Sequence, residues 1–145
     1  MKTRLVGIFV CMLLVVPCLS MTVVADPELE ISIYGGFPVI FKMGNVGGAI
    51  VNVGDATTHN VSYNVVITGG FQDSINYAFN GTGYNISPGN ALGVSTNAIE
   101  GFGPVEITIA VSSSDAGSVN ETAQGFQIGG FTWVPFGWVR VFLSG

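Results

Sequence analysis

The sequence predicts an all-β protein, a β-sandwich of about seven to nine antiparallel strands. Apolar and polar side chains alternate with a period of two through most of the chain after residue 26, as in "ELEISI" at 28–33 and "VSYNVVIT" at 61–68. No window repeats apolar residues at helical spacing among good helix formers. Clusters of Gly, Pro, Asn, Asp and Ser interrupt the alternation about every ten residues, which is typical of short strands joined by turns.

The strands can be placed in order from the alternation and from the turn cluster that follows each one. The expected strands span residues 28–33, 39–43, 48–53, 61–68, 75–79, 92–96, 105–111 and 122–128. The turn clusters between them lie at residues 35–37, 53–55, 68–73, 87–90, 101–104 and 112–118.

One connection predicts how the strands divide between two sheets. The stretch from residue 54 to 60 is too long for a two-residue hairpin turn, so we expect the strands on its two sides to lie in different sheets. Asn52, Gly54 and Asp55 then serve the turn itself, because Gly tolerates positive φ and Asx side chains bond nearby amides. We interpret this region as scaffold.

The beginning of the chain has the pattern of a secretory signal. Lys2 and Arg4 precede an apolar run over residues 5–16, and Val23 and Ala25 stand at positions −3 and −1 of a small-residue cleavage site. These features predict export, and therefore a secreted or cell-surface protein.

The predicted domains follow from that signal. Residues 1–25 are expected to form the signal peptide, cleaved between Ala25 and Asp26, and residues 26–145 a single β-sandwich domain with an aromatic C-terminal segment over 131–145. Two alternatives stay open. Residues 5–24 could be kept as a membrane anchor, or Cys18 could be lipidated, although Pro17 before it is unusual for a lipoprotein.

The composition after residue 25 excludes several classes of function. Both cysteines, Cys11 and Cys18, lie in the signal, so the exported domain contains no thiol and must be held by packing and strand pairing. It contains nine acidic residues and only two basic ones, Lys42 and Arg140. This balance excludes a basic nucleic-acid footprint and disfavours binding to anionic lipid.

Three stretches resemble a known family. "AIVNVGDATTHNVSYNVVITGG" at 49–70, "ISPGNALGVST" at 86–96 and "GFGPVEITIAVS" at 101–112 are similar to the N-x-G-D-A-x-x-x-N-V, P-G and G-F-G pattern of small archaeal secreted proteins related to the cell-adhesion-related CARDB domain. The resemblance covers about residues 28–130. It implies an immunoglobulin-like sandwich and a role in adhesion. The chain departs from the pattern in "FPVIFKMGNVGG" at 37–48 and in its aromatic tail.

No residue pattern indicates an enzyme. His59 is the only histidine and is expected in a polar loop, with neither a nucleophile elbow nor a cysteine nucleophile in the exported domain. The acids are scattered rather than spaced as in a calcium loop, although a weak calcium site at Asp73 or Asp115 stays an alternative. We expect no cofactor and no catalytic residue.

Glycosylation is the modification that the sequence indicates. Four Asn-x-Ser/Thr sequons are present, more than the composition gives by chance, and chance remains the alternative. We expect all four in or beside loops or strand ends, where a glycan fits. The candidate residues are Asn60, Asn80, Asn85 and Asn120.

The C-terminal segment is too short, and too interrupted by Pro135 and Arg140, to span a membrane. Its aromatics either cap the sandwich core or form a docking patch for an envelope subunit or a carbohydrate. The candidate docking residues are Phe131, Trp133, Phe136 and Trp138.

Together these patterns predict a non-catalytic, secreted or cell-surface glycoprotein that acts in envelope structure or adhesion through protein or glycan contacts. The alternative is a binding module for a soluble ligand or calcium, such as an accessory subunit of a larger envelope complex. A membrane partner is expected only if the N-terminal segment is retained or Cys18 is lipidated.

Overall fold

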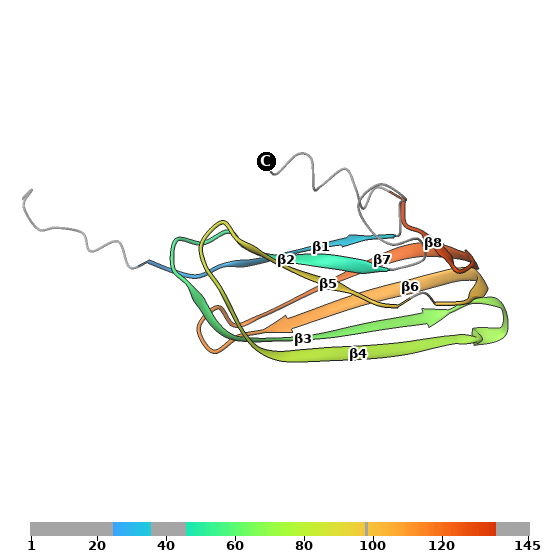
Figure 1. The fold of residues 1–145 in the computed structure, drawn as a ribbon, viewed down its shortest axis with the longest axis horizontal. Helices are drawn as coiled ribbons and strands as arrows, with labels where there is room; N and C mark the ends of the chain where they lie inside the picture. The colour runs from blue at the N-terminus through green and yellow to red at the C-terminus, as the bar shows by residue number, and fades with distance from the viewer. Residues whose placement is uncertain (1–24, 36–45, 98, 136–145) are drawn as a thin grey trace, which may run out of the picture.

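The computed structural model describes residues 25–35, 46–97 and 99–135, which form two antiparallel sheets packed face to face (Figure 1). This confirms the predicted β-sandwich. The smaller sheet has the order β1 (Leu29–Tyr34), β2 (Gly47–Asn52), β5 (Ala91–Ser95). The larger sheet has the order β4 (Ile75–Ile86), β3 (Thr58–Gly69), β6 (Gly101–Ser112), β7 (Ser118–Gly129), β8 (Phe131–Trp133).

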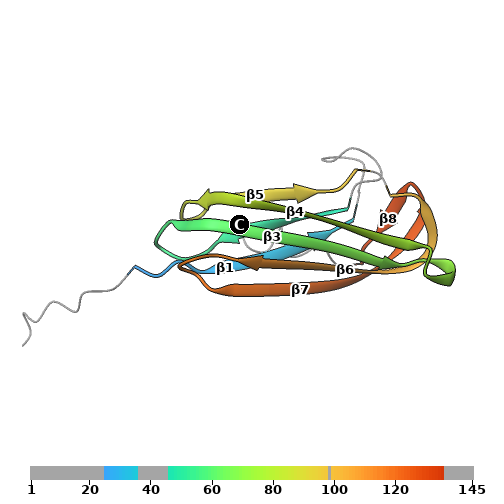
Figure 2. The same cartoon turned by 90° about the horizontal axis from the view of Figure 1, so that it is seen from below.

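The strand order is that of an immunoglobulin-like sandwich with one strand exchanged. In the constant-type domain the first, second, fourth and fifth strands share a sheet. Here the fourth strand, β4, leaves that sheet and pairs with β3 instead. The smaller sheet therefore has three strands and the larger sheet five. In Figure 2 the outer face of the larger sheet is turned toward the viewer.

Alternation explains the core between the sheets. On β6, the side chains of odd-numbered residues such as Ile107 and Ile109 are fully buried, while Glu106 on the opposite face is exposed. Val65 and Ile67 repeat this pattern on β3. Ile50 of β2 closes the core from the smaller sheet. Each such buried aliphatic side chain stabilises the fold by about 1.5–3 kcal/mol.

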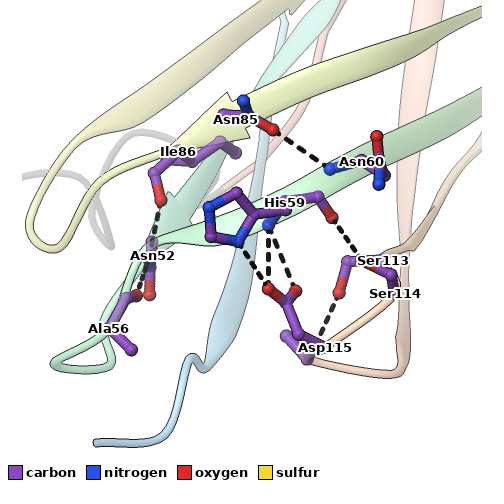
Figure 3. A network of polar contacts seen from close by, with 10 residues as sticks. Asn52, Ala56, His59, Asn60, Asn85, Ile86, Ser113, Ser114 and Asp115 are labelled. Atoms are coloured by element: carbon purple, nitrogen blue, oxygen red, sulfur yellow. Dashed lines mark hydrogen bonds and ion pairs between the residues drawn. The ribbon is translucent and has the colours of Figure 1, made fainter.

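The predicted crossing between sheets is confirmed, since β2 lies in the smaller sheet and β3 in the larger one. Asn52, fully buried, closes the connection: its Nδ2 donates to the carbonyls of Ala56 at 2.7 Å and Ile86 at 2.8 Å (Figure 3), and its Oδ1 accepts from the amide of Gly54 at 3.1 Å. Gly54 is required because a Cβ there would collide with the backbone of Asp26.

Several predicted boundaries are wrong. β4 continues through Gly81 and Gly83 to Ile86, and residues 101–104, expected as a turn, begin β6. Gly103 has φ +121°, and a Cβ there would come within 2.8 Å of the amide of Phe71, so this glycine serves a close approach inside a strand.

Of the remaining predicted strands and turns, one strand lies outside the described residues and two turns lie within them. The expected strand over 39–43 lies outside the described residues. The turns at 87–90 and 112–118 are present, with the amide of Asn90 donating to the carbonyl of Ser87 at 3.0 Å. The described ranges contain no helix long and apolar enough to cross a membrane.

Candidate functional site

The outer face of the larger sheet carries a cluster of exposed apolar side chains at its β8 end. Strand register places them in two neighbouring rows: Phe102, Ile128 and Phe131 in one, and Pro104, Phe126 and Trp133 in the other. The rings of Phe102 and Phe126 meet edge to face at 5.4 Å. We call Phe102, Phe126, Ile128, Phe131 and Trp133 the aromatic patch.

The patch is open to solvent. Phe102 is 60% exposed, Ile128 56% and Trp133 54%. Phe71, which is 69% exposed, belongs to the short 3-10 turn Phe71–Asp73 (η2), and its backbone lies against Gly103 of β6. Exposed apolar residues scattered singly need no explanation, but a contiguous group of large ones indicates a contact surface.

A buried polar network lies directly beneath the patch. The side chains of Gln127 and Thr132 point inward from β7 and β8 and are fully buried. Gln127 donates to the carbonyls of Ile99 and, at 2.8 Å, Gly129, while its Oε1 accepts from the hydroxyl of Thr132. Because every partner is satisfied, the network fixes β8 against β7 and so holds the patch in place.

A shallow polar hollow adjoins the patch on the same sheet. Its volume is about 390 Å³, and Pro104 of the second patch row forms part of its wall. The carboxylate of Glu106 accepts a hydrogen bond from Gln124 at 2.7 Å inside it, and Asp73 lines its edge. The described residues contain no group of three or more His, Cys, Asp and Glu side chains that could hold a metal ion.

His59 lies on β3, not in the loop that we expected, because pairing with β4 begins at Thr58. Its Nδ1 is 2.9 Å from Oδ2 of Asp115, and its amide donates to both Asp115 oxygens at 3.1 Å (Figure 3). The hydrogen bond from His59 lowers the pKa of Asp115 below its ordinary value.

The surroundings of this pair are structural in character. The hydroxyl of Ser114 donates to the backbone carbonyl of His59 at 3.2 Å, and that of Ser113 accepts from the amide of Ala116 at 2.7 Å. The His59 side chain is 56% exposed. The contacts therefore tie the start of β3 to the turn between β6 and β7.

All four sequon asparagines are exposed. Asn60 has φ +51° at an irregularity in the β3–β4 pairing, and its amide donates to Oδ1 of Asn85 near the end of β4 at 3.1 Å (Figure 3). Asn120 lies near the start of β7. The expected placement at a strand end is wrong for Asn80, which lies in the middle of β4 because that strand extends to Ile86.

The other candidate residues are distributed as follows. Trp133 and Phe131 belong to the patch, whereas Phe136 and Trp138 lie outside the described residues. Ala25 and Asp26 are exposed at the first described positions, and the backbone nitrogen of Asp26 lies 2.7 Å from Oδ1 of Asp55. The earlier part of the predicted signal peptide, residues 1–24, lies outside the description.

Sequence reasoning missed three of the five patch residues. Phe102 was assigned to a turn, and Phe126 and Ile128 to a strand without a stated role. The alternation on β6 and β7 already placed these side chains on one face. What brings them together is the register between the two strands, which pairs Phe102 with Ile128.

Fold and surface together define a two-sheet β-sandwich with an exposed aromatic patch. Comparisons with family models, with curated proteins and with solved structures find no match to this chain. The relationship to the CARDB domain therefore stays a prediction from the turn motifs.

Proposed function

We propose that this chain is a non-catalytic, secreted or cell-surface module that acts in envelope structure or adhesion through contacts made by its aromatic patch. The observation that carries the proposal is the exposure of Phe102, Ile128 and Trp133 on adjacent strands of one sheet. The predicted secretory signal supports a location outside the cell or at its surface.

The chemistry of the patch supports docking rather than simple solvation. Large aromatic side chains provide much contact area with little conformational entropy to lose, and they dominate the binding energy of known interfaces. The patch contains no charge in a chain with nine acidic residues, so a partner can approach it without repulsion at the contact itself.

The neighbouring hollow favours a glycan among the possible envelope partners. A sugar ring presents an apolar face and a rim of hydroxyls. Phe126 offers a ring to the first, while the carboxylate of Glu106 and the amide of Gln124, one row away on the same face, offer hydrogen bonds to the second. Apolar surface with a few convergent polar groups is the usual composition of a ligand site.

Co-sedimentation with isolated cell envelopes, and with their purified polysaccharide, tests the proposal. The double variant Phe102→Ala/Trp133→Ala should bind at least about tenfold more weakly, as expected when two central aromatics of an interface are lost. The matched control is Val66→Ala, which removes an outer-face apolar side chain in the middle of β3 and should bind normally.

The melting temperature of the double variant distinguishes a lost contact surface from a lost fold. If it stays within a few degrees of wild type while binding is lost, the patch is a contact surface. Unchanged binding by the folded variant would refute the proposal. Unfolding of the variant would show instead that these aromatics belong to the core, and that the partner must be sought elsewhere.

A second function is binding of a soluble ligand or calcium, for which the hollow lined by Asp73 and Glu106 is the candidate site. Calcium binding to the native state would raise the melting temperature with concentration. Under this alternative the rise would disappear in Asp73→Asn, while Asp115→Asn, remote from the hollow, would retain it. A melting temperature indifferent to calcium would eliminate the calcium site.

A further inference from the structure

The long edge of the larger sheet, strand β4, has neither a charged residue nor a proline to oppose strand pairing. Among the described residues β3 is the only strand that pairs with β4, so the backbone donors and acceptors on its other side are open to another chain. The strand is 12 residues long and contains no charge and no proline. An edge of this kind is a template for self-association.

The other edges of the sandwich are blunted. β8 has only 3 residues and is followed by Pro135. β1 carries Glu30, exposed, with Glu28 just before it, and β5 has only 5 residues. Short strands, charges and proline are three of the devices by which natural sheets avoid edge-to-edge pairing. β4 uses none of them.

Two of the four sequons lie on this same strand, at Asn80 and Asn85. Both side chains are exposed. Oδ1 of Asn85 accepts from the amide of Asn60, so this bond uses the oxygen and not Nδ2, the atom to which an N-linked sugar is attached. The contact is therefore compatible with modification and would hold the modified side chain in a fixed position.

We propose that N-linked glycans on Asn80 and Asn85 guard the β4 edge, in the role that lysine and proline have at other sheet edges. The inference rests on the export included in the proposed function. In the transfer step, Nδ2 of the asparagine bonds to C1 of a lipid-linked oligosaccharide, the bond from C1 to the phosphate oxygen breaks, and the lipid phosphate leaves as Nδ2 loses a proton.

This arrangement leaves the aromatic patch accessible. Across the sheet Asn80 shares a row with Asn64, Ala110 and Asn120, whereas Phe126 and Pro104 form a row six residues further along β7 and β6. At about 3.4 Å per residue the two rows are separated by roughly 20 Å. Glycans on β4 would therefore block the edge without covering the surface proposed for docking.

The experiment begins with the native protein recovered from its own cells. Intact mass and glycopeptide mapping should find sugar on Asn80 and Asn85. Light scattering coupled to size exclusion then compares two double variants, both unchanged in their asparagines. Thr82→Ala/Ser87→Ala abolishes both sequons, and the matched control Thr82→Ser/Ser87→Thr keeps them.

The first variant should at least double its molar mass in a concentration-dependent way, while the control should elute like wild type. Adding Ala78→Lys to the first variant should restore the monomer, because an edge lysine replaces the missing guard. Thr122→Ala, which abolishes only the sequon of Asn120 on β7, should stay monomeric.

Two results would overturn the inference: unmodified Asn80 and Asn85 in the native exported protein, or a folded Thr82→Ala/Ser87→Ala variant that stays monomeric at the concentrations tested. Neither result touches the proposed function, which is judged by binding of the patch variants. Conversely, a glycosylated chain that fails to bind the envelope would contradict the proposed function and leave the guarded edge intact.

Discussion

The two ends of the larger sheet carry different side chains on their outer faces. Toward the turn between β6 and β7 the outer face is polar, with the hydroxyls of Thr108 and Thr122 3.1 Å apart, and the aliphatic layer of the core beneath includes the fully buried Ile109. At the β8 end the outer face contains the exposed ring of Phe102, and the layer beneath includes the fully buried amide of Gln127. Large apolar side chains gathered on an outer face indicate that this end is arranged for contact rather than for solubility.

The aliphatic layer should produce the largest effect. Replacing the fully buried Ile107 by alanine removes apolar contacts and leaves a cavity, which should cost about 4 kcal/mol of unfolding free energy. Urea unfolding measures it. Val66→Ala, on the outer face of the neighbouring strand, should cost far less, and equal costs would show that the two faces are not distinguished by burial.

The β8 end should respond nearly as strongly to loss of its buried amide. Gln127→Ala leaves the carbonyl of Ile99 and the hydroxyl of Thr132 without their partner and should cost about 3 kcal/mol. Hydrogen exchange should then show β8 opening before the rest of the sheet. Gln124→Ala, exposed on the same strand, is the control and should have little effect on either measurement.

At the polar end, the exposed pair His59 and Asp115 should give a smaller, pH-dependent effect. The pKa of Asp115 is lowered in the folded protein, so the stabilisation is complete above the ordinary carboxyl value of about 3.9 and is lost as pH falls through the folded value. Melting curves should separate wild type from Asp115→Asn at pH 6 and converge near pH 2. A constant difference across this range would contradict the assignment.

The smallest effect is expected at the predicted cleavage point. In a chain that begins at Asp26, the nitrogen 2.7 Å from Oδ1 of Asp55 is an α-ammonium rather than an amide, and the hydrogen bond becomes an ion pair. An exposed pair of this kind contributes less than about 1 kcal/mol. Asp55→Asn should lower the melting temperature more in the processed chain than in one that retains residue 25, and added salt should remove the difference.

Much of the fold could be predicted because it depends on local pattern. Alternation located the strands, and the length of the segment from 54 to 60 placed β2 and β3 in different sheets. The alternation predicted the wrong strand ends where pairing with a neighbouring strand outweighs a residue's low strand propensity. Glycine is depleted in strands, yet Gly81 lies in β4 because it pairs with Tyr63 of β3, and Gly83 lies in the same strand at a shift in the pairing register.

The candidate site was less predictable because it depends on register and burial. Trp133 and Phe131 were recognised from composition, but their meeting with Phe102 requires the pairing of β6 with β7 and of β7 with β8, between residues distant in sequence. Gln127 was missed since glutamine is usually exposed. Only its inward position on β7 reveals that it supports the patch.

The strand register also has a consequence for how the chain folds. The pairs β3–β4 and β6–β7 are hairpins, whose partners are close in sequence and can form within about 1–10 μs. The ladder between β3 and β6 joins these two hairpins and pairs Ser62 with Ser112 and Gly69 with Val105. Such closure over long loops is the slow event in sandwich folding, typically taking milliseconds to seconds. During that interval β4 already has its partner β3 while its other side is open, so a nascent chain is exposed to mispairing before its core is complete.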